Sequence, residues 1–279
     1  MPRILTFGGK MVDRNVTVAD LIDGKGKQQF TETTVYNAEE AAAGAQAGID
    51  VLRAWDPVVS EVVSAAPTTF ITAGIAFDAY ETPDQILAAA IRAVSAGADA
   101  VYTPRGLGVV EMLAHEGIPV QGHVGLVPRK STWVGGLRAI GKTCEEALRL
   151  LQDFKDLENA GAYAAEVELV PPETLELINS KTSIVTYSIG CGGAGDVIFL
   201  FMEDICGDIE NPPRHAKSYG DLRGLRQKIW EERLMALKAF KSDVDAGMFP
   251  GPGKAGEHGL ASVGAGLRAS KGDGGIGGR

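Results

Sequence analysis

Two glutamates in the second half of the chain have the spacing of a paired acid–base site. Glu166 and Glu168 lie in the run AAEVELV, and side chains along a strand alternate between its two faces. Both carboxyl groups therefore share one face, while Val167 and Leu169 take the other. Two carboxylates held together inside a barrel repel each other, which raises the pKa of at least one and suits it to proton transfer near neutral pH. A solvated edge strand is the structural alternative.

A histidine and an aspartate stand where two other predicted strands end. His123 follows the apolar run 118–121, and Asp56 follows the run 49–55. An imidazole and a carboxylate can bind substrate or a metal at such a position. Either side chain can also serve the structure alone by hydrogen bonding to nearby backbone groups. The two residues taken by themselves leave both interpretations open.

A third group of candidates lies in the run FTETTVY near residue 30. Thr34 and Tyr36 share one strand face with Glu32. If that face is the interior of a barrel, Glu32 adds another carboxylate to Glu166, Glu168, His123 and Asp56. Oxygen ligands with one imidazole can hold magnesium, manganese or iron, so we expect a metal site here. We expect Thr34 and Tyr36 to bind substrate.

Backbone amides and one arginine are candidates for binding an anion. Gly190 and Gly192 follow a predicted strand, and successive glycines let amide groups turn toward phosphate or carboxylate. A tight turn explains the same glycines. Arg105, in TPRG, can clamp a carboxylate through two parallel hydrogen bonds, although surface arginines are equally common. Between the glycines, Cys191 fits a small core residue better than a nucleophile.

The elements that must position these residues alternate between strands and helices. Apolar and β-branched runs predict eight strands, at residues 30–36, 49–55, 69–73, 100–103, 118–121, 162–170, 183–189 and 197–202. Helical patterns with caps follow most of them; Thr82, Pro83 and Gly97 mark both ends of one helix. This order predicts an α/β fold, a (β/α)8 TIM barrel, in which catalytic groups sit at the carboxyl ends of the strands.

Composition limits the classes of partner. The 279 residues are 45% hydrophobic and 23% charged, typical of a globular protein with a sizeable core, and the net charge is −9. That negative charge argues against nucleic acid and anionic membranes as partners. No apolar run reaches the roughly eighteen residues that a membrane helix needs. The three cysteines form no metal or disulfide pattern, so we expect a cytoplasmic protein.

The chain changes character near its end. Residues 1–250 contain the whole strand and helix pattern and predict a single barrel domain. Residues 251–279 are rich in glycine and nearly free of large apolar side chains. Such a segment buries too little to offset its ordering entropy, which predicts a flexible tail.

Several motifs together carry a family resemblance. GHVGLVP, GGLRAIGKT, LENAGAYAAEVELVP and SIGCGG occur in order, with TVYN and AFDAYETPDQ before them and MFPG after them. The sequence resembles the ketopantoate hydroxymethyltransferase family over roughly residues 16–258. The resemblance implies a barrel of the phosphoenolpyruvate mutase and isocitrate lyase superfamily. It also implies transfer of a one-carbon unit from methylenetetrahydrofolate to a 2-oxo acid, a magnesium ion that the substrate chelates, and a decamer-type homo-oligomer.

The same resemblance assigns roles to three residues and removes others. The family's glutamate base falls on Glu168, its substrate-binding histidine on His123, and its first metal aspartate on Asp56. The second metal aspartate falls on Gly74. A lysine and a further glutamate of the family fall on Tyr102 and Pro104. The resemblance therefore implies a site in which the family's metal ligands are largely lost.

We predict an enzyme that performs aldol-type carbon–carbon chemistry on a 2-oxo acid through an enolate. Glu168 would take the proton, and a metal held by Asp56 and Glu166 would stabilise the enolate. Without a metal, Arg105 and the amides at Gly190 and Gly192 would do so. One alternative is a diverged lyase or hydrolase that acts on another oxo acid without folate and with a relocated or absent metal. A third is a catalytically silent barrel that binds other molecules.

Overall fold

The computed structural model describes residues 1–251, and the chain divides into two compact units, Met1–Asp221 and Leu222–Arg279. The first unit contains the whole barrel and ends well before residue 250. Apart from Gly251, the predicted glycine-rich tail 251–279 lies outside the described residues. No helix in the described part is both long and apolar enough to span a membrane.

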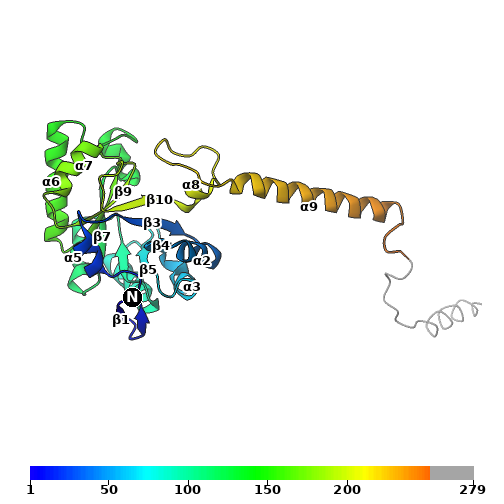
Figure 1. Ribbon diagram of the computed structural model, residues 1–279, viewed down its shortest axis with the longest axis horizontal. Helices are drawn as coiled ribbons and strands as arrows, with labels where there is room; N and C mark the ends of the chain where they lie inside the picture. Colours follow the sequence, from blue (N-terminus) through cyan, green and yellow to red (C-terminus); the bar gives the residue numbers. More distant parts are fainter. Residues whose placement is uncertain (252–279) are drawn as a thin grey trace, which may run out of the picture. The chain divides into compact units, whose positions relative to one another are not determined.

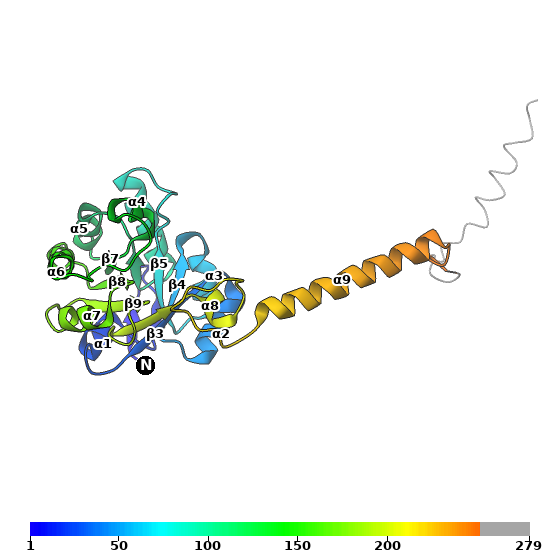
Figure 2. The same ribbon diagram turned by 90° about the horizontal axis from the view of Figure 1, so that it is seen from above.

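Eight parallel strands close into a barrel in the order β10-β3-β4-β5-β6-β7-β8-β9. Figure 1 labels the elements, and Figure 2 shows the strands at the centre of a ring of helices. This architecture confirms the predicted (β/α)8 fold. The barrel strands are β3 (Phe30–Val35), β4 (Val51–Trp55), β5 (Phe70–Gly74), β6 (Ala100–Tyr102), β7 (Val120–Gly125), β8 (Ala164–Glu168), β9 (Val185–Ile189) and β10 (Val197–Leu200).

Helices cover the outer surface of the barrel, and their ends follow the local sequence. In α4, the Thr82 side chain accepts from the Gln85 amide, Pro83 occupies the first turn, and Gly97 ends the helix with φ +119°. The other helices of this unit are α1 (Val18–Gly24), α2 (Ala38–Ala47), η1 (Asp56–Val58), α3 (Val59–Ala65), α5 (Leu107–His115), η2 (Pro128–Val134), α6 (Cys144–Asn159), α7 (Pro172–Asn179) and α8 (Met202–Cys206), while α4 spans Pro83–Ala96.

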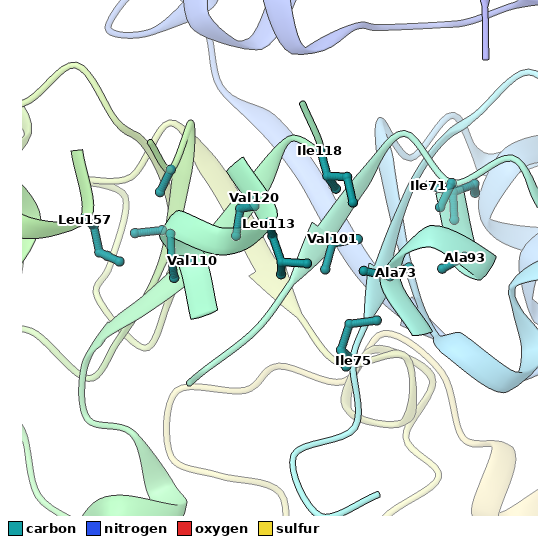
Figure 3. Packing of buried hydrophobic residues seen from close by; sticks show 14 of the residues in the cluster. Ile71, Ala73, Ile75, Ala93, Val101, Val110, Leu113, Ile118, Val120 and Leu157 are labelled. Carbon is teal, nitrogen blue, oxygen red and sulfur yellow. The ribbon is translucent and has the colours of Figure 1, made fainter. Parts of the chain in front are cut away.

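The main core lies between the strands and these helices. Ile71 and Val101 point outward from β5 and β6, and they belong to one buried cluster with Ala93 of α4 and Leu113 of α5 (Figure 3). Because each strand sends alternate side chains outward, its other side chains must fill the barrel interior. The outer cluster thus fixes which residues of every strand face the interior.

The barrel interior changes from apolar to more polar along the strands. Side chains near the amino ends of the strands form a separate apolar cluster that includes Phe30, Val51, Phe70, Val185 and Val197. Two residues further along three of these strands, the inward positions are occupied by Glu32, Arg53 and Thr72. The carboxyl ends of the strands therefore hold the chemistry, as the fold requires.

Two features of the fold differ from the sequence-based expectation. The apolar pattern ends β7 at Gln121, but the strand continues to Gly125, because its residues pair in register with Ala164–Glu168 of β8. His123 therefore lies within a strand, opposite Glu166, and the end of β7 is at Gly125. The first residues also form a two-stranded hairpin, β1 (Arg3–Leu5) with β2 (Met11–Asp13), which their mixed composition did not reveal.

The second unit contains one long helix in its described part. Helix α9 runs from Leu222 to Asp245, and none of its residues is buried. It carries a row of exposed apolar side chains that includes Ile229, Trp230, Leu237 and Phe240.

Candidate active site

A cavity of about 460 Å³ lies at the carboxyl ends of the strands, a size suited to a small ligand. Its floor includes Tyr102, His123, Glu166 and Glu168. The remaining lining residues are Trp55, Ile75, Ala76, Phe77, Asp78, Pro104, Val127, Pro128, Arg129 and Phe201. The structure thus brings Glu166 and Glu168 together, as the alternation of β8 predicted, and places His123 of β7 beside them.

The imidazole of His123 lies between the two glutamates. Its Nδ1 atom is 3.6 Å from Glu166 Oε1, and its Nε2 atom is 3.5 Å from Glu168 Oε2. One donor atom from each of the three residues lies within 4.8 Å of the other two. These three residues are the group in the described part of the chain closest in type and spacing to a metal site.

Hydrogen bonds hold the His123 ring in one orientation. Nε2 is 2.8 Å from the carbonyl oxygen of Leu126, so this nitrogen must carry the proton and donate it. In the neutral ring Nδ1 is then an acceptor, and the Tyr102 hydroxyl, 2.8 Å away, donates to it. Both ring nitrogens are therefore engaged, and neither has a lone pair free for a metal.

Arg53 lies beneath the cavity, and the sequence analysis did not identify it. Its guanidinium bonds Glu32 through Nε at 3.2 Å and Nη2 at 2.8 Å, and Nη1 donates to Glu166. The rings of Tyr102 and Phe199 lie 4.2 Å and 4.5 Å from its central carbon. The sequence did contain a signal, because a charged residue sits at an inward position of the otherwise apolar strand VLRAW.

Burial and ion pairing shift the pKa values of these groups in different directions. Burial raises the pKa of Glu32 to about 7, although the positive charge of Arg53 opposes the shift. For Glu166, burial also favours the neutral form, but the positive charge of Arg53, and that of His123 when its ring is protonated, outweigh it and lower the pKa. Glu166 is therefore held as a carboxylate, while Glu32 binds a proton more readily than an exposed glutamate does.

Glu168 stands at the very end of β8 and keeps contact with solvent. Its side chain is 17% exposed, against 6% for Glu166 and 2% for His123. The next residue, Leu169, has a positive φ of +49°, which is uncommon for a residue other than glycine. Such strain is typical of functional sites, and here it turns the chain away directly after Glu168.

The positions of the family's metal aspartates hold no carboxylate that faces the floor of the cavity. Asp56 begins η1, where it accepts from the Tyr80 hydroxyl and, at 3.5 Å, from the Ala76 amide. A side chain at Gly74 would meet the ring of Trp55 at 2.9 Å, so that space is filled. Asp56, predicted as a metal ligand, lies outside the group of His123, Glu166 and Glu168.

The other predicted binding residues line neither this floor nor its walls. Thr34 is buried and accepts from the Met202 amide, while Tyr36 is exposed and donates to Glu203 at 3.3 Å. Gly190 and Gly192 have positive φ values of +69° and +65°. A side chain at Gly190 would meet Leu169 at 2.6 Å, so packing alone requires glycine there.

Arg105 and Cys191 each have a structural setting. Arg105 donates to the carbonyl oxygens of Phe77 and Tyr80, which holds the segment that walls the cavity. It lines a smaller cavity of about 240 Å³ that shares His123 with the first. The buried thiol of Cys191 donates to Val167, and burial raises its pKa to about 11. A buried thiol with a raised pKa is protonated at neutral pH, which favours a core residue over a nucleophile at Cys191.

The residues present do not fit the magnesium ion that the family resemblance implies. Of the family's acidic positions, Gly74 and Pro104 have no carboxylate, and Asp56 is bonded elsewhere. In the remaining group, Glu166 is paired with Arg53, and both nitrogens of His123 are hydrogen bonded. Magnesium prefers several free oxygen ligands in octahedral arrangement. No chemical step is therefore assigned to a metal.

The family model and the related proteins that match this chain point to the same family. The family model for ketopantoate hydroxymethyltransferase matches residues 56–252. The 3-methyl-2-oxobutanoate hydroxymethyltransferase of Pyrobaculum calidifontis is 32% identical over 87% of this chain and 98% of its own length. The enzyme of that name from Pyrococcus furiosus is 32% identical over 85% of this chain and 90% of its own length.

Among solved structures, one from Burkholderia cenocepacia J2315, described as a candidate phosphonomutase, aligns with a TM-score of 0.50 at 14% identity. The alignment covers 80% of this chain and 100% of the other. At that identity the likeness concerns the barrel fold alone.

Proposed function

The chain belongs to the ketopantoate hydroxymethyltransferase family, and we propose that it performs aldol-type carbon–carbon chemistry on a small 2-oxo acid. One observation carries the proposal: Glu168 presents a partly exposed carboxylate to the cavity beside His123. Glu32 and Glu166, the other two glutamates inside this part of the barrel, are both paired with Arg53. Of these three glutamates, Glu168 is therefore the one available to a substrate.

In the first step Glu168 takes a proton from the carbon next to the substrate's carbonyl group. The carbon–hydrogen bond breaks, its electron pair forms the enolate double bond, and negative charge moves to the carbonyl oxygen. The enolate carbon then bonds to the one-carbon unit of methylenetetrahydrofolate, our proposed donor, and water supplies the hydroxyl group of the product. Both carbon–nitrogen bonds of that unit break, and their electron pairs stay on the two folate nitrogens, which take one proton from the water and one from the protonated Glu168. In the reverse direction the protonated Glu168 returns its proton to carbon.

The cavity offers binding groups for both ends of a 2-oxo acid. Arg129 is the one lysine or arginine among the described residues that line it, and we assign the substrate carboxylate to that side chain. Phe77 and Phe201 supply apolar walls for an alkyl group. Arg105 supports this arrangement by holding Phe77 in place through its backbone carbonyl. Thr34, Tyr36, Gly190 and Gly192, predicted as substrate contacts, take no part in this arrangement, because none of them lines the cavity.

Deuterium exchange into 3-methyl-2-oxobutanoate, followed by NMR in heavy water, tests the proposal without any folate. We expect exchange at the carbon next to the carbonyl and a loss of 100-fold or more in Glu168→Gln, in line with the usual contribution of a general base (about 10² to 10⁴). Glu173→Gln, on the first turn of α7, is the matched control. Equal exchange by wild type and Glu168→Gln would rule out this role.

A second candidate function is a lyase that cleaves another oxo acid without folate. The Trp55 ring over Gly74 favours it, because the family's metal position is filled in this chain. The two functions share the enolate and differ in the partner that it meets. If wild type cleaves hydroxylated oxo acids at rates unaffected by added folate, the lyase is supported.

We also propose that the chain forms a homo-oligomer. Helix α9 exposes Trp230, Leu237 and Phe240 along 24 residues, a pattern typical of a surface that a subunit covers. Sedimentation equilibrium on the full chain tests this, and a monomer at micromolar concentration would contradict it.

A further inference from the structure

The guanidinium of Arg53 is the charge centre of the barrel interior. It forms ion pairs with Glu32 and Glu166, and its side chain is 6% exposed. Two of the groups that it contacts, Glu166 and Tyr102, line the floor of the cavity. Arg53 therefore lies directly below the place where a substrate would sit, one layer of side chains away.

The residues around Arg53 fill the space in which a divalent ion would need ligands. Above it on the same strand, Trp55 covers Gly74, so no carboxylate can be accommodated there. Glu166 already balances its charge against Arg53. Burial acts to lower the pKa of the Arg53 guanidinium, but the attraction of Glu32 and Glu166 outweighs burial and raises it. A second cation next to Glu166 would meet the repulsion of a permanently charged group.

We propose that Arg53 takes the place of a divalent metal ion as the fixed positive charge of this site. It neutralises Glu166, which leaves Glu168 as the reactive carboxylate, and it stabilises the negative charge that develops above Tyr102. Because the Arg53 side chain is only 6% exposed, its preoriented charge acts more strongly than it would in solvent. The inference rests on the proposed function, since it assigns the electrostatic part of that reaction to this chain's own arginine.

The first test measures metal binding directly and needs no activity. Protein purified without chelator is analysed for bound metal and then titrated with Mg²⁺ and with Mn²⁺ by calorimetry. We expect substoichiometric metal and no saturable heat at millimolar concentration. Stoichiometric binding that disappears in Glu166→Gln would overturn the inference, whatever the enzyme turns out to catalyse.

The second test compares two buried arginines. Arg14, at the opposite end of the barrel, is 1% exposed and pairs with Asp99 at 2.8 Å, so Arg14→Lys is a matched control for Arg53→Lys. In the presence of EDTA, wild type should exchange deuterium at its full rate. Arg53→Lys keeps the charge without the planar fork and should lose about tenfold, whereas Arg14→Lys should keep its rate per folded molecule. Equal losses in both variants would make Arg53 merely structural.

A paired variant keeps the test decisive if Arg53→Lys does not fold. Arg53→Met combined with Glu166→Gln removes one charge of each sign, and Glu32, whose pKa is already raised, can become neutral by binding a proton. We expect on the order of 100-fold slower exchange that added Mg²⁺ does not restore. Wild-type exchange in this variant would overturn the inference. Absence of exchange in wild type would refute the proposed function alone, and the metal titration would still decide the role of Arg53.

Discussion

The two ends of the barrel each hold a buried arginine, but the two side chains have different kinds of partner. Arg14 bonds Asp99 and the carbonyl oxygens of Pro67 and Gly97, at the amino ends of the strands. Arg53 bonds two carboxylates and lies against two aromatic rings, near the carboxyl ends. Arg14 has one carboxylate partner and two backbone carbonyls, which tie segments together, whereas Arg53 has two carboxylate partners, whose charges can respond to a ligand. Arg14 therefore stabilises the end of the barrel where the strands begin, whereas Arg53 sets the charge at the end where the cavity lies.

The largest effect on stability is expected at Arg14, at the end of the barrel where the strands begin. Arg14→Met leaves Asp99 buried without its partner and should reduce the free energy of unfolding by about 3 to 5 kcal/mol. Urea denaturation measures the loss, and Arg3→Met, on the exposed β1 strand, is the control. A change below about 1 kcal/mol would mean that the stability of the barrel does not depend on the ion pair of Arg14 and Asp99.

The next effect is a pH dependence of the unfolding free energy, and it comes from Glu32, near the carboxyl ends of the strands. The pKa of Glu32 rises from 4.5 in the unfolded chain to about 7 in the fold. Below pH 4.5 the proton is bound in both states, and between pH 4.5 and 7 only the folded state keeps it. The unfolded state is therefore favoured progressively as the pH rises, by up to about 3 kcal/mol.

Glu32→Gln should remove that slope. Unfolding free energies at pH 5 and pH 8 measure it, with Glu111→Gln on the exposed side of α5 as the control. If wild type and Glu32→Gln lose the same stability across this window, the slope has another origin.

A smaller effect, on deuterium exchange and on stability, is expected from Tyr102 at the floor of the cavity. Tyr102→Phe removes the hydroxyl that donates to Nδ1 of His123, and a group left without its partner costs about 1 to 3 kcal/mol. We expect about tenfold slower deuterium exchange and a stability loss near the lower limit, because the cavity admits water. Tyr163→Phe removes a hydroxyl that contacts Tyr187 near the amino ends of the strands and should leave exchange unchanged. Slower exchange in both variants would mean that the two ends of the barrel do not differ in their effect on the reaction.

The smallest effect is expected at Thr72, where the apolar part of the barrel interior meets the polar part. Thr72 lies between Phe70 and Gly74 on the inward face of β5, and its buried hydroxyl has no hydrogen-bond partner within the described chain. Replacing it with the isosteric Val should leave stability unchanged or raise it by about 1 kcal/mol, since no bond is lost. A clear loss, seen by thermal unfolding, would show that the polar layer reaches down to this residue.

The sequence predicted much of the fold and half of the site, for identifiable reasons. Strand alternation placed Glu166 and Glu168 on one inward face, and the strand–helix order predicted the barrel, because both are local patterns. The pairing of β7 with β8 is tertiary, so the position of His123 within a strand was not predicted. The packing of Trp55 over Gly74 and the ion pairs of Arg53 join different strands, and one sequence shows neither partner.

The closing seam of the barrel has a consequence for how the protein folds. Strand β10 pairs with β3, and the Thr33 hydroxyl bonds the Leu200 carbonyl across 167 positions of the chain. Contacts between such distant segments form slowly, because the entropy of the long loop is lost before they stabilise anything. Glu32 and Phe199 lie opposite each other on this seam, so the surroundings of Arg53 are complete only when β10 has paired with β3. The charged centre thus depends on contacts between the two ends of the barrel sequence, and a chain whose barrel is not closed lacks it.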